Sequence, residues 1–157
     1  MAGTIDMELQ GVREAMGKVR AWEREKKGAV EKAIAKTATN IERKAKRNAP
    51  VDTGRLRASI EVVDVNIPLT KAIRAGNANV RYAAAVEYGA KAHYAPIEPL
   101  KAWAREVLGD EDAAYAVREH IAIEGTPAQP YMGPAWESER EDYVRRVRDA
   151  LAGEGRG

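Results

Sequence analysis

Residues 12–48 constrain the fold most, because their apolar side chains recur at the three- and four-residue spacing of a single helix face. The first members of this stripe are Val12, Met16, Val19 and Trp22. The stripe continues to Ala45 and stops at Asn48-Ala49-Pro50, since proline disfavours helix in the residue before it. The pattern predicts one long helix over 12–48, or two helices with a kink near Gly28.

Alternating polar and apolar residues predict a small sheet after this helix. The alternation runs from Leu56 to Ile67, with a possible bulge at Val63-Asp64. Residues 71–75 and 80–82, on either side of residues 76–79, predict a hairpin. Residues 4–9 alternate in the same way and predict a further strand.

The helical period returns in the second half of the chain. Residues 83–86 predict a short helix with Gly89 as its C-cap. Residues 96–124 predict two more helices, and a final helix is expected from Pro134. Between them, residues 125–130 contain two prolines and predict a loop that is incompatible with helix.

These elements define an α+β fold, in which a long N-terminal helix packs on a small antiparallel β-sheet. We expect a single domain over residues 1–152, with a helical insert at about 96–124 and a C-terminal helix. Residues 153–157 are glycine-rich and predict a disordered tail.

The chain offers few side chains for catalysis or metal binding. It contains no Cys, two His and two Ser. His120 and Glu124 lie four residues apart on one predicted helix, but the only other imidazole is that of His93. Neither serine lies in a nucleophile elbow, and no glycine-rich phosphate loop precedes a helix. The sequence therefore predicts no catalytic residue, no metal and no cofactor, and it disfavours an enzyme.

Composition favours a soluble intracellular protein with a binding or assembly role. Hydrophobic residues make up 45% of the chain and charged residues 32%, and no run of 18 apolar residues occurs. The first ten residues lack the basic and apolar regions of a secretory signal. We therefore expect no membrane partner.

The net charge of +2 conceals a strong asymmetry along the chain. Residues 13–57 carry 14 basic and 6 acidic side chains, a net +8, whereas residues 58–157 carry 12 basic and 16 acidic ones, a net −4. The cations around the helix end are Arg43, Lys44, Lys46, Arg47, Arg55 and Arg57. Phosphate contact, head-to-tail packing of identical subunits and a plain solvated surface all fit this pattern. No aromatic residue lies among these cations, which argues against a base-stacking platform.

Three stretches, taken in order, carry a family resemblance. The first, within residues 46–60, includes NAPVDTGRLRASI; the second, residues 82–89, reads YAAAVEYG; the third, residues 125–135, reads GTPAQPYMGPA. Together they resemble the small neck and tail-completion proteins of long-tailed bacteriophages and prophages, over roughly residues 7–150. The chain departs from the usual family pattern at Tyr131, where Phe is common, and in the insert, which only part of the family carries.

The resemblance implies a non-catalytic virion structural protein with a fold similar to that of tail-terminator proteins. Such a protein forms a ring at the head–tail junction, the neck, or at the upper end of the tail, with six copies expected and twelve as the next possibility. The implied partners are head-closure or adaptor, tail-terminator or tail-tube proteins, with possible non-specific contact to DNA in the lumen. The implied location is the virion, and the host cytoplasm during assembly. The alternative function is a small DNA-binding accessory protein that uses the basic helix end.

The residues expected to form the fold motif, or a subunit or partner interface, come from these stretches and from the helix before them. They are Arg43, Arg47, Pro50, Thr53, Gly54, Arg55, Leu56, Glu87, Tyr88, Gly89, Gln129, Pro130 and Tyr131. Thr53 and Gly54 are expected to shape the turn out of the long helix. Glu87 is expected to pair with a basic residue such as Arg55, in the same or an adjacent subunit. The segment around Gln129 is expected to add backbone hydrogen bonds to a neighbour. For each residue, a role inside the fold is the alternative.

Overall fold

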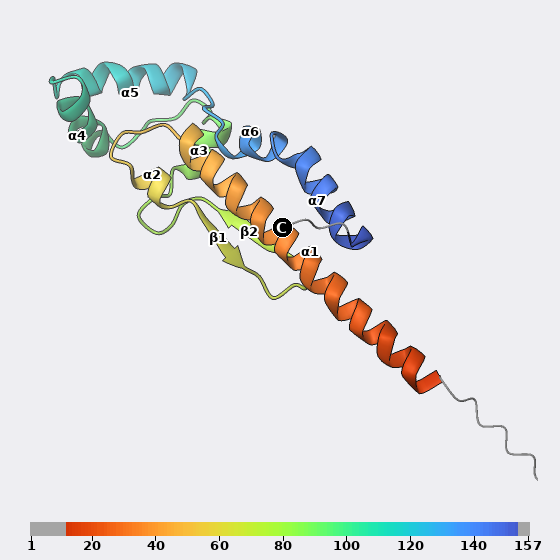
Figure 1. The fold of residues 1–157 in the computed structure, drawn as a ribbon. Helices are drawn as coiled ribbons and strands as arrows, with labels where there is room; N and C mark the ends of the chain where they lie inside the picture. The colour runs from red at the N-terminus through yellow and green to blue at the C-terminus, as the bar shows by residue number, and fades with distance from the viewer. Residues whose placement is uncertain (1–11, 154–157) are drawn as a thin grey trace, which may run out of the picture.

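The computed structural model describes residues 12–153 of the 157-residue chain, and one long helix dominates it (Figure 1). In this part of the chain the elements are, in order, α1 (Val12–Asn48), α2 (Arg55–Ala58), β1 (Glu61–Asp64), β2 (Lys71–Arg74), α3 (Ala83–Tyr88), α4 (Ile97–Val107), α5 (Ala113–Glu124), α6 (Met132–Glu137) and α7 (Arg140–Ala152). The predicted α+β class is confirmed, because helices surround a two-stranded antiparallel sheet. The strand predicted at residues 4–9 lies outside the described residues.

Helix α1 is continuous through Gly28, so the single-helix alternative is confirmed. Its 37 residues span about 55 Å at the α-helical rise per residue. The C-terminal half packs against β1, β2, α6 and α7. The N-terminal half extends beyond these elements (Figure 1).

The strand predicted from Leu56 is wrong at its start, because residues 55–58 form the single-turn helix α2. Gly54 takes a left-handed conformation, with φ 75°, that glycine adopts without the steric cost of a side chain. The Ala58 amide then donates to the Gly54 carbonyl at 2.9 Å. Leu56 and Ile60 are therefore buried at a four-residue spacing instead of alternating along a strand.

Strands β1 and β2 pair in an antiparallel register that sets Val62 opposite Ile73. The predicted hairpin across residues 76–79 is wrong, because the two strands are connected by residues 65–70. Residues 76–79 belong to a tight turn that is closed by an isolated bridge between Asn77 and Val80. The Asn77 side-chain oxygen accepts the amides of Asn79 and Val80, at 2.9 and 3.1 Å, and this favours the turn over a longer strand.

The predicted helices of the second half form, with one change at the C-terminus. Helix α3 ends at Gly89, and the insert folds as the packed pair α4–α5. The single helix expected from Pro134 is divided into α6 and α7. The division falls at Ser138 and Glu139, where the Ser138 hydroxyl donates to the Ala135 carbonyl at 2.9 Å and the Glu139 side chain is buried.

The core lies where the three motif stretches meet the C-terminal half of α1. Small side chains dominate it, and Tyr131 and Ile60 are its largest fully buried members. The cluster comprises Ile41, Ala45, Ala49, Leu56, Ile60, Val80, Ala83, Tyr131 and Ala135. Many of these residues are alanines, and their small side chains allow the backbones of the packed elements to approach closely.

Candidate functional site

Glu87 joins the second motif stretch to the third. Its carboxylate accepts the backbone amides of Tyr131 and Met132 at 2.7 and 2.8 Å through Oε2, and that of Gly133 at 2.8 Å through Oε1. Burial favours the neutral acid, but these three donors outweigh burial and hold the pKa of Glu87 below its ordinary value. The expected pairing with Arg55 is not made within the chain, because the carboxylate is already bonded to the N-terminal turn of α6.

Gly89 allows the same two stretches to approach at the backbone. The Ala90 amide donates to the Thr126 carbonyl at 2.9 Å, and the Thr126 amide donates back to the Ala90 carbonyl at 2.8 Å. The Gln129 amide donates to the Val86 carbonyl at 2.8 Å. The segment around Gln129 therefore makes, inside this chain, backbone hydrogen bonds of the kind expected with a neighbour.

Replacing Gly89 with alanine is expected to destabilise the fold by about 2 kcal/mol or more. Its φ is 75°, and a Cβ there would lie 2.7 Å from the Thr126 carbonyl oxygen, which is backbone and cannot move aside cheaply. Gly109→Ala is a matched control, because Gly109 has φ 71° and its Cβ would meet no atom within 4 Å. Chemical denaturation measures the free energy of unfolding of both variants. Both carry the strain of a positive φ, but only Gly89→Ala also clashes with the Thr126 carbonyl. Equal losses of unfolding free energy would contradict the close approach of the two stretches at Gly89.

Tyr131 fixes the third stretch to the other two. Its side chain is 1% exposed, and its hydroxyl donates to the Ala83 carbonyl at 3.1 Å. The Asn48 amide group donates to the Tyr131 carbonyl at 3.4 Å, which connects the end of α1 to the same residue. The buried hydroxyl with its own acceptor accounts for a tyrosine at this position.

The exposed sides of the three stretches line one surface hollow, here called the motif hollow. Its lining combines the turn after α1, the start of α2, α3, the extended segment before α6 and Trp103 from the insert. The lining residues are Pro50, Val51, Asp52, Thr53, Gly54, Arg55, Leu56, Tyr82, Val86, Trp103, Thr126, Pro127 and Gln129. Six of the residues predicted from the sequence therefore lie together here.

The first part of the chain matches a known protein family. Residues 13–89 match the HK97-gp10-like family of phage tail components. The family is described as "Bacteriophage HK97-gp10, putative tail-component". This match confirms the predicted resemblance over residues 13–89, which contain the first two motif stretches. It indicates a structural tail protein in the virion, in contact with other tail proteins. No curated protein and no solved structure matches the chain significantly.

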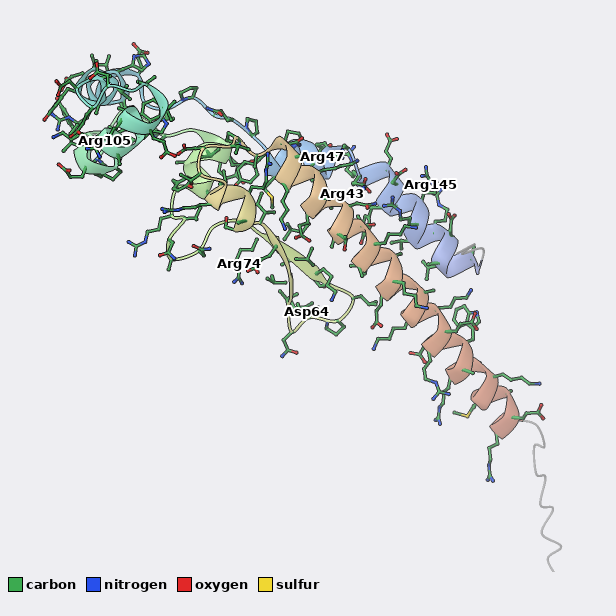
Figure 2. All side chains as sticks on the ribbon, turned by 60° about the vertical axis from the view of Figure 1, so that its left-hand side comes forward. Arg43, Arg47, Asp64, Arg74, Arg105 and Arg145 are labelled. Carbon is green, nitrogen blue, oxygen red and sulfur yellow. The ribbon has the colours of Figure 1, made fainter. Side chains whose placement is uncertain are left out.

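The HK97-gp10-like segment carries the predicted cations, but the structure divides them among three places. Arg43, Lys46, Arg47 and Arg57 line one open depression together with Thr39 and Glu42, and we call it the basic hollow. Lys46 pairs with Glu42 there at 2.6 Å. Figure 2 labels Arg43 and Arg47 on the C-terminal half of α1. Arg55 lines the motif hollow instead, and Lys44 turns towards α7, where it pairs with Glu139.

Glu139 is a buried residue that the sequence analysis missed. Its side chain is 4% exposed and contacts Lys44 at 2.7 Å and Arg146 at 2.9 Å, while the Asn40 amide donates to it at 3.3 Å. Burial raises its pKa, but these donors outweigh that effect and lower the pKa from 4.5 to about 2. No local signal distinguishes Glu139 from the exposed carboxylates beside it, because its partners on α1 lie more than 90 residues away in the chain.

Several of the remaining predicted residues are exposed. Tyr88 is 80% exposed, and the side chains of Thr53, Gln129 and Pro130 also reach solvent. Within residues 12–153, no group of three or more acidic or histidine side chains is placed to bind a metal ion. None of the helices in this range combines the length and the apolar character needed to cross a membrane.

Proposed function

We propose that this protein is a virion structural protein of a tailed phage that forms a ring at the head–tail junction, or at the upper end of the tail, and so completes and joins the tail. The observation that carries the proposal is the match of residues 13–89 to phage tail components. The motif stretches support it, because their buried members hold a rigid centre and their exposed members line the motif hollow, where a neighbouring virion protein can bind.

The charge distribution supports a ring of identical subunits. A heterologous interface repeats the same two unlike surfaces around a closed axis. The net charges of +8 over residues 13–57 and of −4 over residues 58–157 fit such an interface. We favour six copies, with twelve as the next possibility, in contact with a head-closure or adaptor protein, a tail terminator or a tail-tube protein.

The direct test is negative-stain electron microscopy of lysates from a phage that lacks this gene. Filled heads beside separate tails would support a role at the junction. Tails of abnormal length beside normal heads would support a role in tail termination. Intact and infectious particles would contradict the proposal. A plasmid copy of the wild-type gene is the control, since it should restore normal particles.

Reversal of Arg43 and Arg47 to Glu is expected to lower the titre of infectious particles at least about tenfold. We propose that the basic hollow lies at a subunit interface or faces the lumen, where it contacts DNA without reading sequence. The matched control is the pair Arg74→Glu and Arg148→Glu, which makes the same change in net charge at exposed positions. A normal titre from the Arg43 and Arg47 variant would contradict this placement.

The basic hollow also supports the alternative function, a small DNA-binding accessory protein. Arg43, Arg47 and Arg57 can neutralise phosphates there, while Lys46 is paired with Glu42. Each neutralised phosphate adds about −0.9 to the slope of log K against log salt concentration. Tight binding of purified protein to duplex DNA, with a steep loss on adding salt, would favour this alternative if the deletion phage also formed intact particles. Under our first proposal, the isolated protein binds duplex DNA weakly.

A further inference from the structure

The N-terminal half of α1, residues 12–27, presents large apolar side chains that are mostly exposed; we call this half the free helix. Met16, Val19 and Trp22 are 51%, 62% and 58% exposed. They continue the stripe that, further along α1, buries Val30 and Ile41. The C-terminal end of α7 lies near the end of the free helix. A Cβ built on Gly153, the C-cap of α7, would lie 2.6 Å from Lys26 Nζ.

The free helix is also strongly basic. It carries Arg13, Lys18, Arg20, Arg24, Lys26 and Lys27 against Glu14, Glu23 and Glu25, a net charge of +3. Two free helices placed side by side would therefore bring like charge together. The stripe is better complemented by a surface that is both apolar and acidic.

The α4–α5 pair, residues 96–124, is such a surface; we call it the insert. It carries seven acidic and three basic side chains, a net charge of −4. Its exposed apolar residues include Val107, Tyr115 and Ile123, at 52%, 47% and 71%. Tyr115, Glu119 and Ile123 follow one another at a four-residue spacing on α5, so acidic and apolar side chains share one face of that helix.

The free helix and the insert lie at opposite ends of the molecule (Figure 1). Figure 2 agrees, since it labels Arg105 on α4 at the end away from the start of α1. The two surfaces cannot meet within one chain, so a contact between them must join two copies. Because the surfaces are unlike, the contact is heterologous and repeats from each copy to the next, which gives a ring when the rotation between copies closes.

We infer that the free helix of one copy docks on the insert of the next copy, and that this contact is the subunit interface of the ring. The inference rests on the proposed function, in which the copies form a ring. Trp22 and its apolar neighbours are buried against the exposed apolar side chains of the insert. Arg20 and Lys27 lie about two helical turns apart, beside the apolar stripe. In the docked pair they face acidic residues of the insert, such as Glu106 and Glu119.

A charge-swap experiment in the deletion phage tests the interface. Arg20→Glu with Lys27→Glu, or Glu106→Lys with Glu119→Lys, brings like charges together, and each pair is expected to lower the titre about a hundredfold. The variant with all four substitutions has the wild-type net charge and is expected to regain most of the titre. Arg74→Glu with Arg148→Glu, outside both surfaces, is the control. A normal titre from both charge-reversed pairs, or no recovery in the fourfold variant, would overturn the interface.

The two proposals fail in different ways. If the deletion abolishes infectivity but both reversals support normal growth, the interface is wrong and the structural function stands. If the deletion itself gives a normal titre, the proposed function is wrong. Folding is checked by circular dichroism of each purified variant, and Trp22→Ala gives a second probe, since its exposed side chain contributes little to folding but is expected to be needed for titre.

A disulfide cross-link tests directly which surfaces are neighbours. The chain contains no cysteine, so Trp22→Cys combined with Ile123→Cys introduces the only two thiols. Mild oxidation of assembled particles is expected to give a ladder of multiples of 17.2 kDa on a non-reducing gel. Either substitution alone should give no ladder. Particles that assemble normally but give no ladder from the double variant would overturn the inference.

Discussion

Replacing Glu87 with alanine is expected to lower the free energy of unfolding by about 3 kcal/mol or more. The carboxylate is 8% exposed, and the amides of Tyr131, Met132 and Gly133 donate to it at 2.7 to 2.8 Å. Alanine leaves these three donors without an acceptor, and the cost of an unsatisfied buried donor exceeds the net value of the bond. Denaturant unfolding followed by circular dichroism measures the loss.

The neighbouring residue gives a matched control for Glu87. Tyr88 is 80% exposed, so Tyr88→Ala is expected to change the free energy of unfolding by no more than about 0.5 kcal/mol. Glu87→Gln should fall between the two, because it keeps one acceptor oxygen but loses the charge. If Glu87→Ala were no less stable than Tyr88→Ala, the carboxylate would not be holding the third stretch in place.

Replacing Glu139 with glutamine is expected to cost about 3 kcal/mol at neutral pH. The carboxylate bridges Lys44 of α1 and Arg146 of α7 with its own side chain 4% exposed, so the substitution leaves two cations without their shared partner. Arg146 also donates to the Thr37 hydroxyl at 3.1 Å, which extends the network between the two helices. We therefore expect the substitution to act mainly by weakening the packing of α7 against α1.

The pH dependence gives a second measure of the Glu139 network. Its pKa in the folded protein is about 2, below the ordinary 4.5, so the folded state favours the ionised carboxylate. Its contribution is fully present above about pH 5 and is lost as the pH falls towards 2. The difference in unfolding free energy between wild type and Glu139→Gln should therefore be largest at neutral pH and shrink through this range.

Glu141 is the control for Glu139, because it lies two residues away on the exposed side of α7. Glu141→Gln is expected to leave both the unfolding free energy and its pH dependence close to those of the wild type. A pH-independent difference for Glu139→Gln would show that packing, not charge, is what Glu139 contributes.

The sequence predicted local elements well where a short pattern decides them. The 3.6-residue period gave α1 its bounds, and Gly89 marked the end of α3 because a positive φ suits glycine there. It failed at residues 55–58, where alternation suggested a strand. The left-handed Gly54 started a helical turn instead, and that turn set Leu56 and Ile60 on the same side of the chain.

The candidate site was predicted as a list of residues but not as an arrangement. Arg43, Arg55 and Lys44 belonged to one basic cluster in the sequence, and the fold sends them to the basic hollow, the motif hollow and the buried ion pair respectively. Glu87 was predicted to pair with a cation of the same or an adjacent subunit, and within the chain it binds backbone amides. Every residue except proline has a backbone amide, so the sequence does not indicate which amides bind a carboxylate. A basic side chain was therefore the only kind of partner for Glu87 that the sequence indicated.

The sequence by itself determined the long helix, the turn at Gly54, the α+β class and the family resemblance, since each depends on residues close together in the chain. Only the tertiary structure decided which charges are buried and which apolar residues remain exposed. Glu87 meets its three amide partners across 44 to 46 residues, and Glu139 meets Asn40 across 99. The apolar stripe of α1 has one period throughout, yet half of it lies in the core and half is exposed, because burial depends on how far the packed elements extend and not on the residues of the stripe.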